Sequence, residues 1–175
     1  MRVLVNLLVL LGLPLFLIQS STTEEATTSK SAVSTFAGKS AAFCTPRFSF
    51  CLDYPYALLS NKVESDNGDG IDLYSDDASI QVSAYGSNNV YDWDAKEIID
   101  YNLQEYASEG TTVKILSIEE GINRASVTFK FDGYLHYQEI QLMNDHYLVL
   151  NLSLEDENEV TLELLKSSVS LQISA

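Results

Sequence analysis

The chain has 175 residues, of which 46% are hydrophobic, so it can hold one domain with a sizeable core after a leader segment. Its formal net charge is −15, because 25 acidic residues outnumber 10 basic ones. An acidic surface repels the phosphates of nucleic acid and the headgroups of anionic lipid, so both are disfavoured as partners. The charge suits either a soluble, self-repelling surface or a face that binds cations or basic partners.

The N-terminus has the pattern of a secretory signal peptide. Met1 and Arg2 give a minimal positive start, and residues 3–18 are apolar with few interruptions. This run is too short and too interrupted for a comfortable membrane span. We predict a signal peptide over residues 1–20 and export to the periplasm or the medium, with no membrane span in the mature chain. An uncleaved anchor is the alternative.

A change of composition follows the leader. Residues 21–42 are rich in Ser, Thr and Ala and show no sustained helical or strand period. This segment is predicted to be a flexible linker, and the domain is predicted to cover residues 43–175.

Cys44 and Cys51 are the only cysteines, and export would favour their oxidation to a disulfide. An extended run over 47–51 covers about 13 Å. The chain before it must therefore reverse to bring the two Cα atoms within about 6 Å, and Pro46 can begin that reversal. Two buried free thiols are the alternative.

Alternating apolar residues and turn signals predict seven strands. They cover about 47–54, 70–75, 79–85, 111–118, 124–131, 134–143 and 146–154. Asp132-Gly133 and Asn144-Asp145 have the composition of tight hairpin turns. Gly86 to Asn89 is predicted to be a polar turn.

Two helices complete the predicted elements. Asp94 and Glu97 have the spacing of a capping box, which predicts a helix opening at 92–94, running to about Ser108 and stopping near Gly110. Its expected apolar stripe comprises Ile99, Leu103, Tyr106 and Ala107. A second helix is predicted from about 157 to 171, with a stripe comprising Val160, Leu164 and Leu171.

The last predicted hairpin indicates the fold class. With a two-residue turn, Met143 pairs with His146, and both faces of the hairpin are then apolar over part of their length. A sheet that is apolar on both faces needs cover on both faces. We therefore predict an α+β fold, in which an antiparallel sheet of six to seven strands has helices on both faces.

Several short motifs resemble those of the PsbP-like α/β/α sandwich family, in particular its small exported bacterial members. Phe48–Pro55 resembles an opening strand that ends in Tyr-Pro, and Asn67–Gly70, Leu73–Asp77 and Val82–Ser87 follow in the order of the family pattern. The resemblance covers about residues 43–174. It implies a fold more than a function, since members mostly bind or stabilise partners and are not generally catalytic. Cys51 within the strand departs from the pattern, and no lipidation cysteine follows the leader.

Catalytic and metal-binding patterns are weak. His136 and His146 lie far apart in the predicted hairpin, and no nucleophile, zinc or phosphate-loop motif occurs. The acidic turn with Asp66 and Asp69 partly matches a calcium loop, but Ser65 stands at its first position and Asp76 at its last, where Asp and Glu are needed. No catalytic residue, metal site or cofactor is predicted.

Aromatic and acidic residues near loops are the best binding candidates. They are Tyr54, Tyr56, Tyr85, Trp93, Asp66 and Asp69, with Tyr91 close to Trp93 in the sequence. Aromatic rings at loop ends can form a recognition patch, although they also cap the edges of cores. The leading hypothesis is an exported, non-enzymatic domain that binds a protein partner or an envelope component. The alternatives are a small-ligand or cation-binding module and a secreted enzyme or inhibitor with a site in the acidic loops.

Overall fold

A computed structural model describes residues 39–108, 110, 112–155 and 159–174. These residues all fall in the compact unit Val33–Ala175. The predicted signal peptide and most of the predicted linker lie outside them. No helix in this part of the chain is long and apolar enough to cross a membrane.

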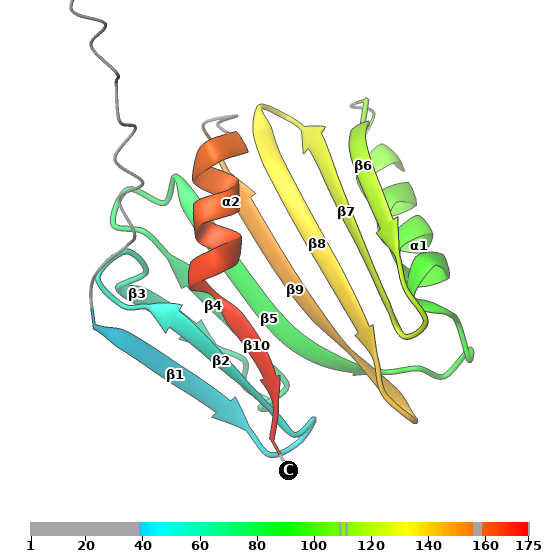
Figure 1. Ribbon diagram of the computed structural model, residues 1–175, viewed down its shortest axis with the longest axis horizontal. Coiled ribbons are helices and arrows are strands. Elements are labelled where there is room, and N and C mark those ends of the chain that lie inside the picture. Colours follow the sequence, from blue (N-terminus) through cyan, green and yellow to red (C-terminus); the bar gives the residue numbers. More distant parts are fainter. Residues whose placement is uncertain (1–38, 109, 111, 156–158, 175) are drawn as a thin grey trace, which may run out of the picture. The chain divides into compact units, whose positions relative to one another are not determined.

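The described chain forms ten strands and two helices (Figure 1). In chain order they are β1 (Ser40–Thr45), β2 (Phe50–Pro55), β3 (Asn61–Glu64), β4 (Gly70–Tyr74), β5 (Ile80–Asn88), α1 (Ala95–Ser108), β6 (Lys114–Glu120), β7 (Arg124–Phe131), β8 (Tyr134–Leu142), β9 (His146–Leu154), α2 (Glu159–Ser168) and β10 (Ser170–Ile173).

The strands form two antiparallel sheets, where the sequence predicted one. The large sheet has seven strands in the order β3-β4-β5-β9-β8-β7-β6, and the small sheet has the order β1-β2-β10. Of the small sheet, the sequence predicted only the central strand β2 and neither of the two edge strands. Strand β1 begins at Ser40, inside the predicted linker, and β10 begins at Ser170, inside the last turn of the predicted second helix.

The end of α2 shows why the predicted extent of the second helix, to about residue 171, was wrong. The helix stops at Ser168, and Leu171 then pairs with Leu52 of β2. Leu162, Leu165 and Val169 are buried, whereas Leu164 and Leu171 of the predicted stripe are only partly buried. Strand pairing between distant segments overrode the local helical pattern.

The hairpin β8–β9 has the predicted register. Gln141 pairs with Leu148, and Glu139 pairs with Leu150. The backbone N–H of Met143 donates to the carbonyl of His146 over 2.8 Å, which closes the two-residue turn. This register places alternate residues of β8 and β9 against two separate hydrophobic cores.

Helix α1 covers one core of the large sheet. Its residues Ile98 and Ile99 pack with Val127, Phe129 and Ile140 of β7 and β8. The helix begins as predicted, because Glu97 N–H donates to Asp94 Oδ1 and Asp94 N–H donates to Glu97 Oε2, both over 2.8 Å.

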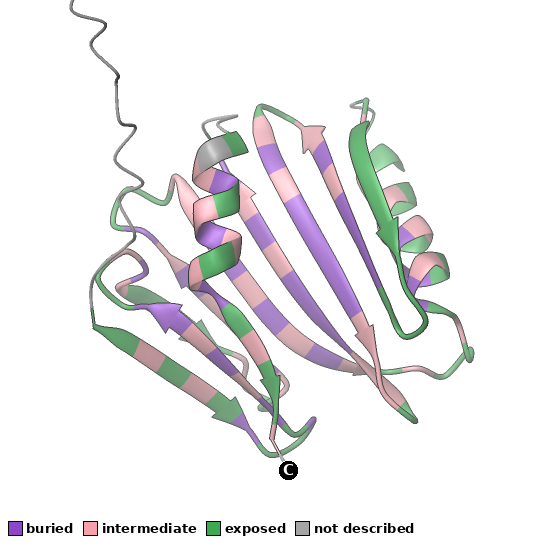
Figure 2. Cartoon of the chain, in the orientation of Figure 1, coloured by how far each residue is buried: buried purple, intermediate pink, exposed green. Residues whose placement is uncertain are grey.

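The other core is shared by α2, the small sheet and the leucines of β9. Leu162 and Leu165 of α2 pack in one cluster with Phe50, Leu52 and Leu152. Figure 2 shows buried positions along α2, β2 and β9. The prediction of a helix on each face is therefore correct only in part, because a second sheet supplies much of this cover. Strand β6 is exposed along its whole length at one edge of the large sheet.

The two cysteines form a disulfide. Cys44 of β1 lies directly opposite Cys51 of β2, with Cα atoms 4.1 Å apart. The geometric difficulty foreseen from the sequence disappears because β2 begins only at Phe50, so Pro46 to Ser49 form the turn. Ser49 has φ of 50°, which lets the chain reverse within those residues.

Removing this disulfide is expected to cost about 2 kcal/mol of unfolding free energy, because the cross-link closes a short loop in the unfolded chain. The double variant Cys44→Ala/Cys51→Ala is compared with the wild type by urea denaturation. Reduction of the wild type should give the same loss. Equal stability of the oxidised and reduced wild type would contradict the expectation.

Candidate functional site

Strand β10 is an edge strand of the small sheet. It lies beside Arg124, Tyr137, Glu139 and Gln141 of β7 and β8, which we call the polar wall. It pairs with β2 on one side only, so some of its backbone N–H and C=O groups have no strand partner. Ile173 at its end is 48% exposed. Such an edge can accept a further strand.

Residues of β10 line two adjoining hollows. The larger has a volume of about 680 Å³ and includes Ile173; the smaller, of about 280 Å³, includes Ser170 and Leu171. Both also include Arg124 and Gln141. We call the two hollows together the β10 groove.

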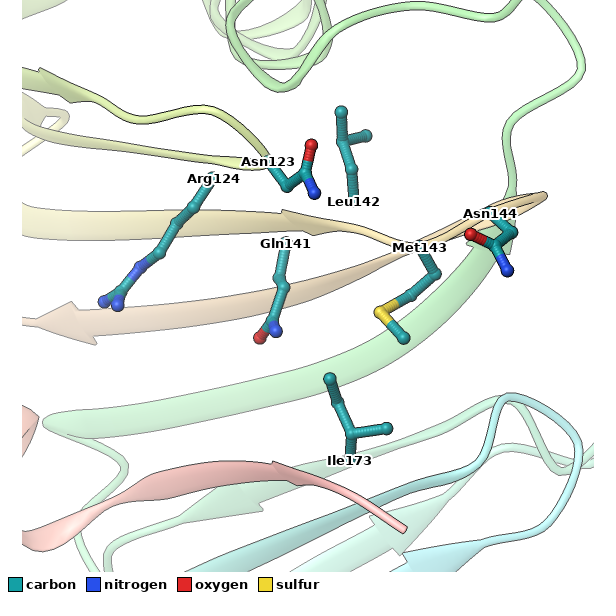
Figure 3. A pocket seen from close by; sticks show the side chains of 7 residues that line it. All are labelled: Asn123, Arg124, Gln141, Leu142, Met143, Asn144 and Ile173. Atoms are coloured by element: carbon teal, nitrogen blue, oxygen red, sulfur yellow. The ribbon is translucent and has the colours of Figure 1, made fainter. Parts of the chain in front are cut away.

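Figure 3 shows the larger hollow from close by. Met143 and Ile173 point toward each other across it, and the side chains of Gln141 and Arg124 lie on the same side of the sheet as Met143. The amides of Asn123 and Asn144 complete the polar part of the lining. The hollow therefore offers apolar contact beside groups that both donate and accept hydrogen bonds.

An ion pair forms the centre of the polar wall. Arg124 Nη2 lies 2.6 Å from Glu139 Oε2, and the hydroxyl of Tyr137 donates to the same oxygen over 2.8 Å. The Arg124 side chain is 62% exposed, whereas that of Glu139 is 11% exposed. Lys166 of α2 lies over the Tyr137 ring, 4.5 Å from its centroid.

These contacts shift two pKa values upward. Burial, followed by the hydrogen bond to Glu139, raises the pKa of Tyr137 to about 12. Partial burial is the largest single influence on the Arg124 pKa and lowers it, but the negative charge of Glu139 and the hydrogen bonds to Tyr137 and Glu139 together outweigh burial and raise the pKa. At neutral pH, Tyr137 is thus a neutral donor, and Arg124 is a cation with further N–H groups available to a ligand.

The predicted aromatic candidates are not gathered in one place. Tyr54 is buried in the core, and Tyr56 is 51% exposed in the turn just after β2. Tyr85 and Trp93 both pack against the core beneath α1. Trp93 also stacks on Tyr91, with ring centroids 4.8 Å apart.

Asp66 and Asp69 lie in the turn between β3 and β4, whose polar groups bond to one another. Asn67 Nδ2 donates to Asp69 Oδ2 over 2.6 Å, and the hydrogen bond from Ser65 is the main cause that lowers the Asp69 pKa. Arg47 Nη1 donates to the carbonyl of Asn67 over 3.0 Å. Within the described ranges, no group of three or more His, Cys, Asp or Glu could hold a metal ion.

Sequence reasoning missed the residues of the β10 groove. It placed Arg124 and Gln141 correctly in strands but named neither as a binding candidate. One signal was available: the predicted register sets Glu139 opposite Leu150, and a carboxylate beside buried leucines needs a partner. The other wall of the groove could not be foreseen without β10.

Comparisons with known proteins concern the fold. No protein-family model and no curated protein matches the sequence. The solution structure of cyanobacterial PsbP (CyanoP) from Synechocystis sp. PCC 6803 is similar, with a TM-score of 0.58 and 11% identity over 76% of this chain and 92% of that chain. A crystal structure from Bacteroides thetaiotaomicron VPI-5482 aligns with a TM-score of 0.43 and 16% identity over 76% of this chain and 48% of that chain. The chain has a PsbP-like fold, and the resemblance noted in its motifs is confirmed at that level.

Proposed function

We propose that this chain is an exported, non-enzymatic domain that binds an extended segment of a protein partner in the β10 groove. One observation carries the proposal: an edge strand with unpaired backbone groups lines two adjoining hollows opposite a polar wall. Main-chain hydrogen bonds to β10 would supply affinity, and the hollows would select side chains of the bound segment.

The chemistry of the wall suits a polypeptide ligand. Gln141, Asn123 and Asn144 carry amides that match peptide groups, and Met143 and Ile173 offer apolar contact. The Cys44–Cys51 disulfide supports a location outside the reducing cytosol, as does the pattern of residues 1–20. Non-catalytic, partner-binding relatives are what the PsbP-like resemblance implies, by analogy of fold alone.

Site-specific photo-crosslinking in the source cells tests this function. A benzophenone amino acid at position 173 is expected to crosslink one partner protein, because that residue lies in the groove. Adding Arg124→Ala is expected to reduce the yield several-fold, since the variant removes the exposed cation of the wall.

Position 63 provides a matched control. Val63 is another exposed aliphatic residue on an edge strand, 59% exposed on β3 against 48% for Ile173 on β10. The photo-reactive residue at position 63 should not capture the same partner. Equal capture from both positions, or no capture from position 173, contradicts a binding groove at β10.

A further inference from the structure

A second cleft lies beside α1, outside the β10 groove. It has a volume of about 410 Å³ and is lined by eight residues: Ser87, Asn88, Asn89, Val90, Tyr91, Trp93, Tyr101 and Tyr147. We call it the aromatic cleft. Four of its residues carry aromatic rings, and none of the eight carries a charge.

The rings form a row on the surface. Tyr91 stacks on Trp93, and Trp93 lies against Tyr101 with ring centroids 5.1 Å apart. Trp93 is thus flanked by two tyrosines, of which Tyr91 is 70% exposed and Tyr101 is 47% exposed. Ring surface of both tyrosines is open to a ligand.

The loop that carries these rings is held in place before any ligand arrives. Asn89 Nδ2 donates to the carbonyl of Trp93 over 2.8 Å, and Trp93 N–H donates to Asn89 Oδ1 over 3.0 Å. The Asn89 N–H also donates to the carbonyl of Asp145. A loop fixed in this way loses little conformational entropy on binding.

Acidic residues neighbour several lining residues of the cleft. Asp92 lies between Tyr91 and Trp93 in the loop, and a hydrogen bond from Tyr101 to Glu105 is the main cause that raises the Tyr101 pKa. Asp145, whose carbonyl anchors the loop, has a side chain that is 89% exposed and lies 2.7 Å from His146 Nδ1. Lys96, in the first turn of α1, is paired with Asp100 over 2.5 Å. Carboxylates therefore lie next to lining residues of the cleft, and its ring faces also attract cations.

We propose that the aromatic cleft binds an arginine side chain from a basic segment of a protein partner. A guanidinium group is planar and weakly hydrated, so it stacks on an aromatic ring while its N–H groups donate to oxygens at the rim. The amide oxygen of Asn88 and the hydroxyl of Ser87 are acceptors within the lining. The net charge of −15 draws such a segment toward the protein.

Trp93 is the only tryptophan in the chain, so its fluorescence reports on this cleft alone. The full chain is titrated, at physiological salt, with a blocked tetra-arginine peptide, and a saturable change in Trp93 emission is expected. Blocked tetra-citrulline has nearly the same shape without the charge and should give no saturable change. Isothermal calorimetry with the same peptides detects binding that leaves the emission unaltered.

Two tyrosine variants localise the effect. Tyr91→Ala is expected to weaken binding about five-fold, as an exposed cation–π contact of about 1 kcal/mol predicts, and Tyr91→Phe should bind nearly as the wild type does. Tyr56→Ala removes an exposed tyrosine that does not line the cleft and is the matched control. Three results would each overturn the proposal: binding of citrulline equal to that of arginine, no binding by either readout, or equal effects of Tyr91→Ala and Tyr56→Ala.

Discussion

Replacing Gly86 with alanine is expected to lower the unfolding free energy by about 3 kcal/mol, through overpacking of the core. Gly86 lies within β5, and a Cβ atom there would come within 2.5 Å of Phe48 Cβ and closer still to Phe48 Cγ. Those atoms lie at the base of a side chain that is only 6% exposed, so Phe48 cannot swing aside without leaving the core. Urea denaturation monitored by circular dichroism measures the loss.

Two further variants test this cause. Gly121→Ala is the control, because its Cβ would meet only the Arg124 carbonyl at 3.4 Å, and it should change stability by less than about 0.5 kcal/mol. Phe48→Ala removes the obstructing ring and costs about 3 kcal/mol by itself. If the clash is the cause, Gly86→Ala costs clearly less in the Phe48→Ala background than in the wild type, because only the contact with the Cβ of residue 48 remains and no buried ring holds that residue in place. Additive losses would point to another origin.

Gly86 illustrates what a local pattern does and does not predict. The sequence Gly86 to Asn89 has turn composition, yet β5 continues through it to Asn88, because nine residues of β5 pair with β9. The glycine is required by a ring packing against the strand, not by a turn. Several elements specified by neighbours in sequence were predicted well: β7, β9 and the β8–β9 register agree with the structure. The short strands β1 and β3, which also pair with the next strand in sequence, were missed.

Strand β10, which depends on pairing with a distant strand, was not predicted. Strand β2 carries β1 on one side and β10 on the other, and β10 follows β2 by more than a hundred residues. A single sequence gives no register between segments so far apart. The β10 groove could not be predicted for the same reason, because one of its walls is β10. The aromatic cleft was found in part, because Tyr91 and Trp93 are close in sequence, whereas Tyr101 and Tyr147 join them only through packing of α1 and β9.

Raising the pH from 9 to 12 is expected to remove about 3 kcal/mol of stability through Tyr85 and Tyr137 together, after allowance for their residual solvent contact. Burial raises the pKa of Tyr85 to about 12, and burial with the Glu139 hydrogen bond raises that of Tyr137 to about 12. The usual value of 10 applies in the unfolded chain. Their contribution is therefore complete below pH 10 and is lost as the pH rises toward 12, where the unfolded chain binds fewer protons than the folded one.

Phenylalanine substitutions separate the two tyrosines within that titration. Tyr137→Phe costs about 1 kcal/mol at pH 7, because Glu139 loses one donor, but the variant should lose less stability than the wild type between pH 10 and 12. Tyr85→Phe should likewise reduce the loss of stability between pH 10 and 12. Tyr56→Phe is the control for loss of an exposed hydroxyl. Urea midpoints across this pH range measure the slopes. The contrary outcome is an equal loss of stability in Tyr137→Phe and the wild type between pH 10 and 12. In that case the raised pKa of Tyr137 is not the cause of the loss, and the contacts among Arg124, Glu139 and Tyr137 in the β10 groove are looser than their distances imply.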